Sequence, residues 1–181
     1  MRKDIKPANW DSAAAIVINA ICDMSGSHEY STLPDDLACQ EAVEARFDDI
    51  VENVFHGDND PEVIEEQFFD LAIAALCGYA FTAEISHQKA ASLIYETVVG
   101  KQKMYGHGNI SRFEIPGVVI RTNDKLERLK NLRKHNGPVL FEPIQDTWLD
   151  ICGYSLIAIM WVRGWFLLNL KNQETSANSG E

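Results

Sequence analysis

The segment that decides the fold is Asp60–Phe81, with the sequence DPEVIEEQFFDLAIAALCGYAF. It opens with an aspartate, whose side chain can cap a helix, followed by a proline, which fits the first helical turn. Apolar and aromatic residues then lie beside three acids at helical spacing. We therefore predict a helix over residues 61–81.

Similar patterns on both sides of this segment predict further helices at residues 10–24, 36–55, 83–103, 119–134 and 143–170. Residues 105–117, YGHGNISRFEIPG, contain three glycines and a proline, and we expect a loop there. Strand signals are few, and only Gly117–Ile120 with Pro138–Phe141 leaves one short β-pairing open. The prediction is an all-α chain that folds as a single bundle of about six helices over residues 1–171. Residues 172–181, NQETSANSGE, are predicted to be a disordered tail.

Composition and charge exclude some classes of function. The chain has 181 residues, enough for one well-formed core, and a net charge of −11. Such a charge does not favour binding to a nucleic-acid polymer. The four cysteines are scattered and include no CxxC pair, which predicts free, buried thiols in a reducing compartment. The N-terminus has no apolar signal core, so we expect a cytoplasmic protein.

The most apolar stretch lies near the C-terminus, at residues 151–170. Arg163 lies inside it and no basic cluster flanks it, so we expect a buried core or interface helix and no membrane span. The part from Ile157 to Leu168 is apolar on nearly every side. A second subunit is one way to bury such a helix, which predicts a homo-oligomer.

Two segments of the chain share a pattern of acids. Residues 62–72 read EVIEEQFFDLA and residues 142–152 read EPIQDTWLDIC. In each segment three acids are spaced i, i+4, i+8 and therefore share one helix face. The six acids are Glu62, Glu66, Asp70, Glu142, Asp146 and Asp150. Like charges one turn apart disfavour a helix, so we predict that the two helices share a divalent cation such as Mg²⁺. Two solvated acidic faces are the alternative.

Positive charge is concentrated in residues 101–134, where nine basic and three acidic residues give +6. Arg121, Lys125 and Arg128 form one stripe of the expected helix and can bind phosphate oxygens. The preceding glycine loop contains His107 and allows close backbone approach to a ligand. A solvated face with an Asp124–Arg128 pair is the alternative.

One set of residues within residues 95–160 forms a recognisable pattern: Lys101, Tyr105, Gly106, Arg121, Asp124, Lys125, Arg128, Glu142, Asp146, Thr147, Asp150 and Tyr154. In this pattern the segment resembles the phage-associated family called nucleotide modification associated domain 1. Met104 stands where the family has an aspartate. The acidic helices are similar in style to those of all-α nucleoside triphosphate pyrophosphohydrolases of the MazG type. The resemblance implies a role in phage nucleotide metabolism, and a location in the host cytoplasm if a phage encodes the chain.

The leading hypothesis is Mg²⁺-dependent hydrolysis of a (deoxy)nucleoside triphosphate to its monophosphate and pyrophosphate. Glu66, Asp70, Asp146 and Asp150 would hold the metal, and Glu62 or Glu142 would orient water. The residues expected to bind the nucleotide are Lys101, Tyr105, His107, Arg121, Lys125 and Arg128. Two other hypotheses stay open: a non-catalytic protein that sequesters a nucleotide or a cyclic nucleotide signal, and a helical interaction module.

Overall fold

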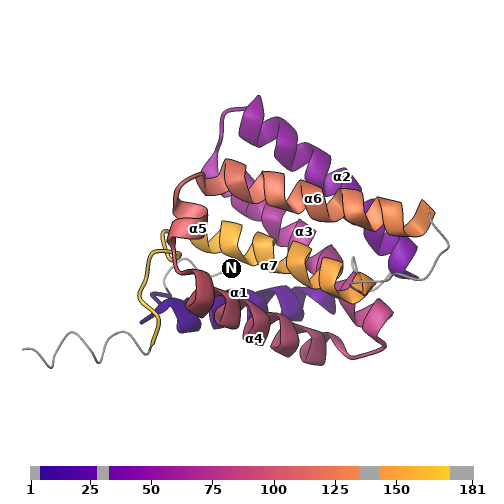
Figure 1. Ribbon diagram of the computed structural model, residues 1–181, viewed down its shortest axis with the longest axis horizontal. Helices are drawn as coiled ribbons and strands as arrows, with labels where there is room; N and C mark the ends of the chain where they lie inside the picture. The colour runs from indigo at the N-terminus through magenta and orange to yellow at the C-terminus, as the bar shows by residue number, and fades with distance from the viewer. Residues whose placement is uncertain (1–4, 28–32, 135–142, 172–181) are drawn as a thin grey trace, which may run out of the picture.

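The computed structural model describes residues 5–27, 33–134 and 143–171, and every regular element in these ranges is a helix (Figure 1). The seven helices are α1 (Trp10–Ser25), α2 (Asp36–Phe55), α3 (Pro61–Ala83), α4 (His87–Tyr105), α5 (Gly108–Ser111), α6 (Glu114–Lys134) and α7 (Ile144–Val162). The prediction of an all-α bundle is confirmed. The predicted tail, residues 172–181, lies outside the described residues.

Side-chain caps explain where the first helices begin. The Asn9 side chain accepts a hydrogen bond from the Ser12 backbone N–H at 2.9 Å, and the Ser12 hydroxyl accepts one from the Asn9 backbone N–H at 3.0 Å. Asp35 caps α2 in the same way, through the Ala38 N–H. The Asp60 carboxylate accepts from the Glu62 N–H at 2.8 Å, as the Asp60-Pro61 pair predicts. These bonds satisfy backbone donors that a helix start otherwise leaves unpaired.

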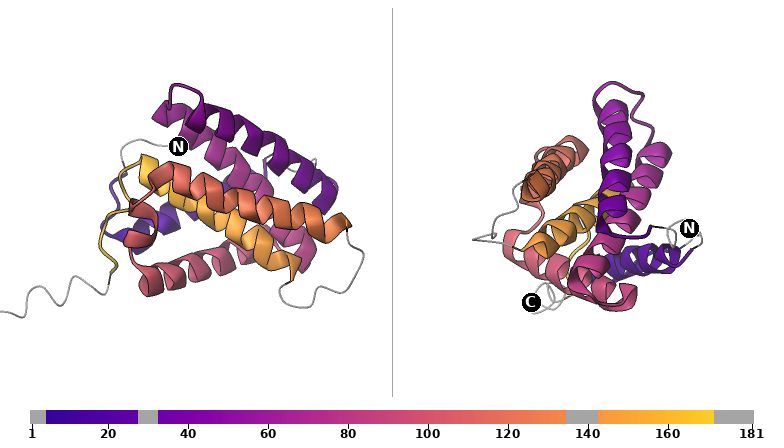
Figure 2. Two further views of the ribbon diagram at one scale, coloured as in Figure 1. Left: turned by 45° about the horizontal axis from the view of Figure 1, so that its top comes forward. Right: turned by 90° about the vertical axis from the view of Figure 1, so that its right-hand side faces the viewer.

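Helices α3 and α7 form the centre of the bundle and run antiparallel. Near one end the Gln145 side-chain amide donates to the Thr82 carbonyl at 2.6 Å, and Trp148 lies over Gly78. At the other end the Arg163 guanidinium donates to Glu65. Figure 2 shows α2 and α6 on one side of this pair, and Figure 1 shows α1 and α4 on the other.

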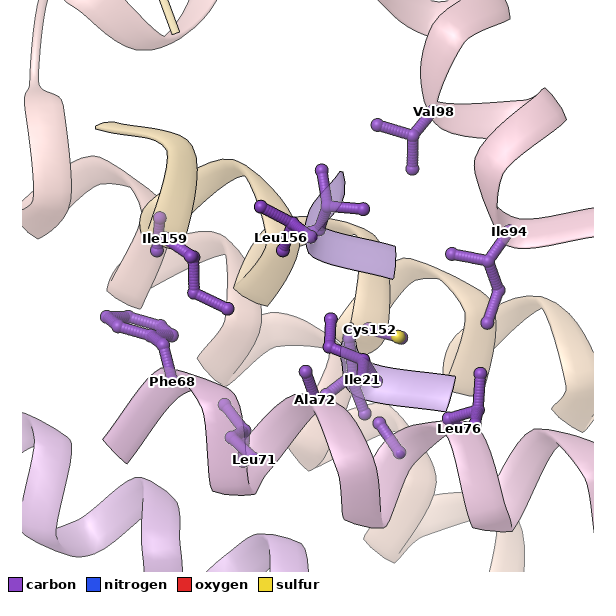
Figure 3. Close-up of a cluster of buried hydrophobic side chains, with 14 of the residues drawn as sticks. Ile21, Phe68, Leu71, Ala72, Leu76, Ile94, Val98, Cys152, Leu156 and Ile159 are labelled. Atoms are coloured by element: carbon purple, nitrogen blue, oxygen red, sulfur yellow. The ribbon is translucent and has the colours of Figure 1, made fainter. Parts of the chain in front are cut away.

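The buried side chains of all seven helices form one apolar cluster. Figure 3 shows its centre, where Phe68, Leu71 and Leu76 of α3 meet Cys152, Leu156 and Ile159 of α7. Phe68, Trp148, Leu149 and Ile151 are buried, whereas Phe69 is only partly buried. All four cysteines are free, and Cys39, Cys77 and Cys152 are buried.

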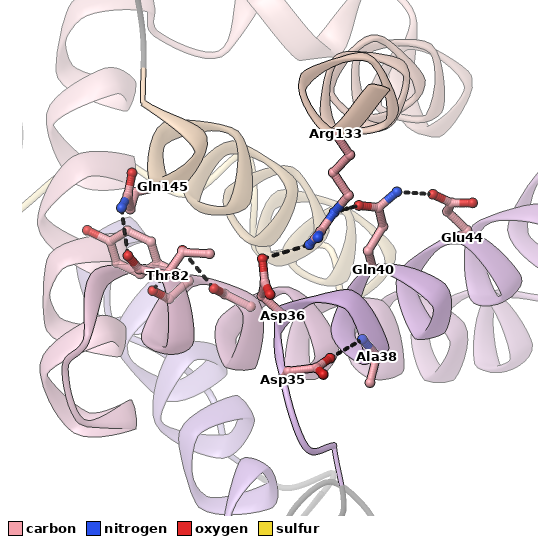
Figure 4. Close-up of polar contacts among 10 residues, drawn as sticks. Asp35, Asp36, Ala38, Gln40, Glu44, Thr82, Arg133 and Gln145 are labelled. Carbon is pink, nitrogen blue, oxygen red and sulfur yellow. Dashed lines mark hydrogen bonds and ion pairs between the residues drawn. The ribbon is translucent and has the colours of Figure 1, made fainter. Parts of the chain in front are cut away.

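Polar contacts attach α6 to α2. The Arg133 guanidinium donates to Asp36 at 2.7 Å and to the side-chain oxygen of Gln40, whose amide nitrogen donates to Glu44 at 2.6 Å (Figure 4). Part of the predicted basic segment is therefore used to hold two helices together.

Several predicted boundaries differ from those in the structure. Residues 105–117 are not one loop, because α5 lies within them and α6 starts at Glu114. The possible strand Gly117–Ile120 is part of α6, because Pro116 fits a first helical turn and Val118 and Val119 are buried as helical residues. Its expected partner, Pro138–Phe141, lies outside the described residues. The fourth predicted helix starts at His87 instead of residue 83, after Glu84 adopts a left-handed φ of 54°.

The last helix also ends earlier than predicted, at Val162 instead of residue 170. Gly164 adopts a φ of 69°, which a glycine takes without strain and which ends the helix. The chain then turns back, and the Trp10 N–H donates to the Asn169 carbonyl at 2.9 Å. Phe166 is buried edge-on against Trp10. Much of the apolar stretch is therefore covered within one chain, and the homo-oligomer stays a prediction.

Among the described helices, none alone has the length and apolar character of a membrane span, although the bent pair α3 and α4 passes that test together by length and composition only.

The contact between Gly78 and Trp148 makes the first testable prediction. A Cβ added at Gly78 would lie 2.7 Å from two atoms of the fully buried indole, so we expect Gly78→Ala to lower the free energy of unfolding by about 1–3 kcal/mol. Gly100 of α4 is the control, because a Cβ there meets no atom within 4 Å. Gly100→Ala should raise the free energy of unfolding by about 0.5–1 kcal/mol. Urea unfolding followed by circular dichroism measures both changes, and a stabilising Gly78→Ala would contradict the close crossing of α3 and α7.

Candidate ligand-binding site

A pocket of about 350 Å³ lies between the C-terminal part of α4, helix α5 and the adjoining sides of α6 and α7. In Figure 1, α5 lies between the start of α6 and the end of α4. Polar and charged residues from all four helices line it: Lys101, Gln102, Tyr105, Asn109, Arg121, Lys125, Asp150 and Tyr154. The volume lies within the range of about 300–1,000 Å³ that is usual for small-molecule sites.

Helical spacing explains why these residues meet. Lys101 and Tyr105 are one turn apart on α4, Arg121 and Lys125 are one turn apart on α6, and Asp150 and Tyr154 are one turn apart on α7. Residues four positions apart lie on the same helix face. Each of the three helices therefore presents a pair of side chains to the pocket.

Asp150 links three of the helices. Its carboxylate accepts a hydrogen bond from the Lys101 ammonium group and lies 2.7 Å from the Nζ of Lys125. The side chain is only 14% exposed. Burial by itself would raise the pKa of Asp150, but the hydrogen bonds and charges of the two lysines outweigh it and hold the pKa below the ordinary value of 3.8. The carboxylate is thus ionised at neutral pH and fixes two ammonium groups at the pocket wall.

Arg121 is held by the short helix α5. Its Nη2 donates to the Asn109 side-chain oxygen at 2.7 Å. Arg128, the third residue of the predicted basic stripe, does not line the pocket. Its guanidinium donates to the hydroxyl of the buried Thr147 and joins α6 to α7 farther along.

His107 has a structural position. Its Nε2 lies 3.0 Å from the Leu168 carbonyl oxygen, which can only accept, so Nε2 is the donor. The ring packs edge-on against Phe166 with centroids 5.5 Å apart. The predicted ligand-binding residue His107 therefore holds the C-terminal segment against the bundle and is not part of the pocket lining.

The structure does not bring the predicted metal ligands together. Glu62, Glu66 and Asp70 line a separate groove beside α1, and Asp70 lies 3.9 Å from Arg46 of α2. The antiparallel register places Asp70 opposite residues near 157 of α7, which is about 10 Å along the axis from Asp150.

The remaining acids do not complete a cluster. Asp146 is exposed, and burial together with the Asp146 charge raises the pKa of Tyr79. Within residues 5–27, 33–134 and 143–171, no three acidic, histidine or cysteine side chains form a group that could hold a metal ion. Glu142 lies outside the described residues.

The hydrogen bonds of Ser25 and the burial of two cysteines do not favour nucleophilic catalysis by these residues. The Ser25 hydroxyl donates to the Cys22 carbonyl at 2.7 Å, so the His87 Nδ1, 3.1 Å away, acts as donor to Ser25 and not as its base. Burial raises the pKa of the Cys39 thiol to about 12 and that of Cys77 to about 11, which keeps both thiols protonated.

Sequence reasoning missed two polar residues of the pocket, Gln102 and Asn109. Val98, Gln102 and Tyr105 occupy positions i, i+4 and i+7 of α4 and therefore share one helix face. An amide on an otherwise apolar helix face is visible in the sequence and could have marked Gln102 as a candidate site residue. Asn109 has no such signal, because its role depends on the short helix α5.

No family model matches the chain, and no curated protein or solved structure matches it. The resemblance to the nucleotide modification associated domain 1 family stays a prediction.

The position of Asp150 makes the second testable prediction. In Asp150→Asn the two lysines lose their common counter-charge, so we expect the free energy of unfolding at pH 7 to fall by about 1–2 kcal/mol, a value reduced because Lys101 is half exposed. If Asp150 instead lay in a cluster of mutually repelling acids, Asp150→Asn would raise the free energy of unfolding. Asp146→Asn on the same helix is the control, with an expected change within about 0.5 kcal/mol.

The lowered pKa of Asp150 also predicts how the stability of this variant, relative to wild type, depends on pH. A carboxyl group whose pKa is lowered on folding adds stability above its unfolded pKa, and this contribution is lost as pH falls through the folded pKa. The difference between wild type and Asp150→Asn should be constant above about pH 5 and shrink below about pH 4. Denaturation curves from pH 3 to 7 measure it, and a difference that grows on acidification would contradict the ion pairs.

Proposed function

We propose that the chain binds a nucleotide through its phosphate groups in the pocket formed by α4, α5, α6 and α7. The observation that carries the proposal is the charge of the lining. Lys101, Lys125 and Arg121 face the same space as one carboxylate, which leaves an excess of two positive charges in a protein whose net charge is −11. A local cationic site in an acidic protein favours a small anion.

The donors suit phosphate oxygens. A lysine ammonium group has three N–H donors, so the contact of Lys101 with Asp150 is compatible with a second, anionic partner. Arg121 offers a planar fork that matches two oxygens of one phosphate. Asn109 fixes this guanidinium at the pocket, so less conformational freedom is lost on binding.

Two tyrosines supply a surface for the rest of a nucleotide. Tyr105 is 60% exposed and Tyr154 is partly buried, and both line the pocket. Aromatic rings beside cationic groups are the usual platform for a base next to its phosphate. The resemblance stated from the sequence supports the same site, because six of its residues line the pocket: Lys101, Tyr105, Arg121, Lys125, Asp150 and Tyr154. It would place the protein in phage nucleotide metabolism.

Binding can be tested with a matched pair of lysines on α6. Lys125 lines the pocket, whereas Lys130 lies five residues farther along α6 and pairs with Glu127 at 3.0 Å. Calorimetry with nucleoside mono-, di- and triphosphates should show binding that Lys125→Met and Arg121→Ala each weaken by about 10- to 100-fold, because each removes a charged hydrogen bond. Lys130→Met should bind as wild type does. Absence of any binding, or an equal loss in Lys130→Met, would overturn the proposal.

Mg²⁺-dependent pyrophosphohydrolysis is the second candidate, and Asp146 and Asp150 on one face of α7 favour it. The side chains around Asp150 do not form a metal site by themselves, because its carboxylate is already paired with two lysines. Mg²⁺ is often held by one or two carboxylates together with substrate phosphates. We expect nucleotide binding without release of pyrophosphate in the presence of Mg²⁺. Release that is lost in Asp146→Asn would favour the hydrolase instead.

A further inference from the structure

Gln102 is a buried polar residue that the charged lining does not explain. Its side chain is 6% exposed, it lines the pocket, and its amide nitrogen Nε2 is buried without a hydrogen-bond partner among the residues that the structure describes. Leaving a buried donor unpaired destabilises the folded state. Such a group in a pocket indicates a partner that enters with a ligand.

The surroundings of Gln102 define the chemistry of that partner. Apolar side chains, among them Val98, Ile110 and Ile157, line the same pocket as Lys101, Lys125 and Arg121. Phosphate oxygens match the cations, whereas a flat group with apolar faces matches the aliphatic side chains. An amide N–H can only donate, so the flat group must carry an acceptor such as a carbonyl oxygen or a ring nitrogen.

We propose that Gln102 determines specificity by donating a hydrogen bond to the base of the bound nucleotide. The inference rests on the proposed nucleotide binding and adds to it that the ligand carries a base. Ribose phosphates and inorganic phosphate then bind only through the cations. A site built to hydrogen-bond a ligand group discriminates strongly against molecules that lack that group.

The test compares ribose 5-phosphate with the four common nucleoside 5′-monophosphates by calorimetry. Wild type should prefer at least one of the monophosphates. Gln102→Met keeps the length of the side chain and removes the donor, so this preference should fall about tenfold while the affinity for ribose 5-phosphate stays unchanged. Gln88→Met, at an exposed position of the same helix, is the control and should keep the preference.

The melting temperature of the free protein separates a ligand contact from a structural one. Replacing an unpaired buried amide by an apolar side chain should leave the melting temperature of Gln102→Met equal to or above that of wild type. A fall beyond that of Gln88→Met would show that the amide holds the fold together, through water or protein, and would overturn the inference. An unchanged preference in Gln102→Met, or equal binding of ribose 5-phosphate and all four monophosphates by wild type, would overturn it while leaving phosphate binding intact. Absence of binding by any of these ligands would overturn both proposals.

Discussion

The close contact between Gly78 of α3 and Trp148 of α7 is the constraint on which the rest of the structure depends. With no side chain at Gly78, the indole lies directly on the backbone of α3, and the two helices take one antiparallel register. A helix turns by about 100° per residue, so two positions after Trp148 the chain faces the opposite side. Because Trp148 points toward α3, Asp150 points toward α4 and α6, where it pairs with Lys101 and Lys125.

Asp150 in turn determines the shape of the pocket. A carboxylate that is covered to this degree would cost several kcal/mol if it had no partner. Lys101 from α4 and Lys125 from α6 offset that cost, and both are thereby attached to α7. The two ion pairs close the space between α4 and α6 at Asp150, and the pocket lies beside them. The same ion pairs that make the buried charge tolerable thus order the cations that we propose bind phosphate.

The sequence predicted the parts of this arrangement that depend on local chemistry. Caps such as Asp60 mark helix starts, and the spacing of Arg121 and Lys125 correctly put them on one face. It did not predict which helix each face meets. The i, i+4, i+8 pattern of acids is compatible with a parallel or an antiparallel pair, and only tertiary packing separates Asp70 from Asp150. The end of α7 was missed for a similar reason, because the apolar pattern continues past Gly164 although its left-handed backbone ends the helix.

The charge distribution is the reason why we propose a small ligand and not a polymer for this site. Arg133 of α6 is held by Asp36 of the acidic helix α2, whereas Arg121 and Lys125 line the pocket. Charges are screened over about 8–10 Å in physiological salt, so a ligand confined to the pocket interacts mainly with the local cations. A polynucleotide extends well beyond that distance, and outside the basic segment 101–134 the charges of the chain sum to −17, which disfavours further phosphate groups. We therefore propose that the pocket takes a single nucleotide, whose phosphate charges the excess of two positive charges in the lining can largely balance.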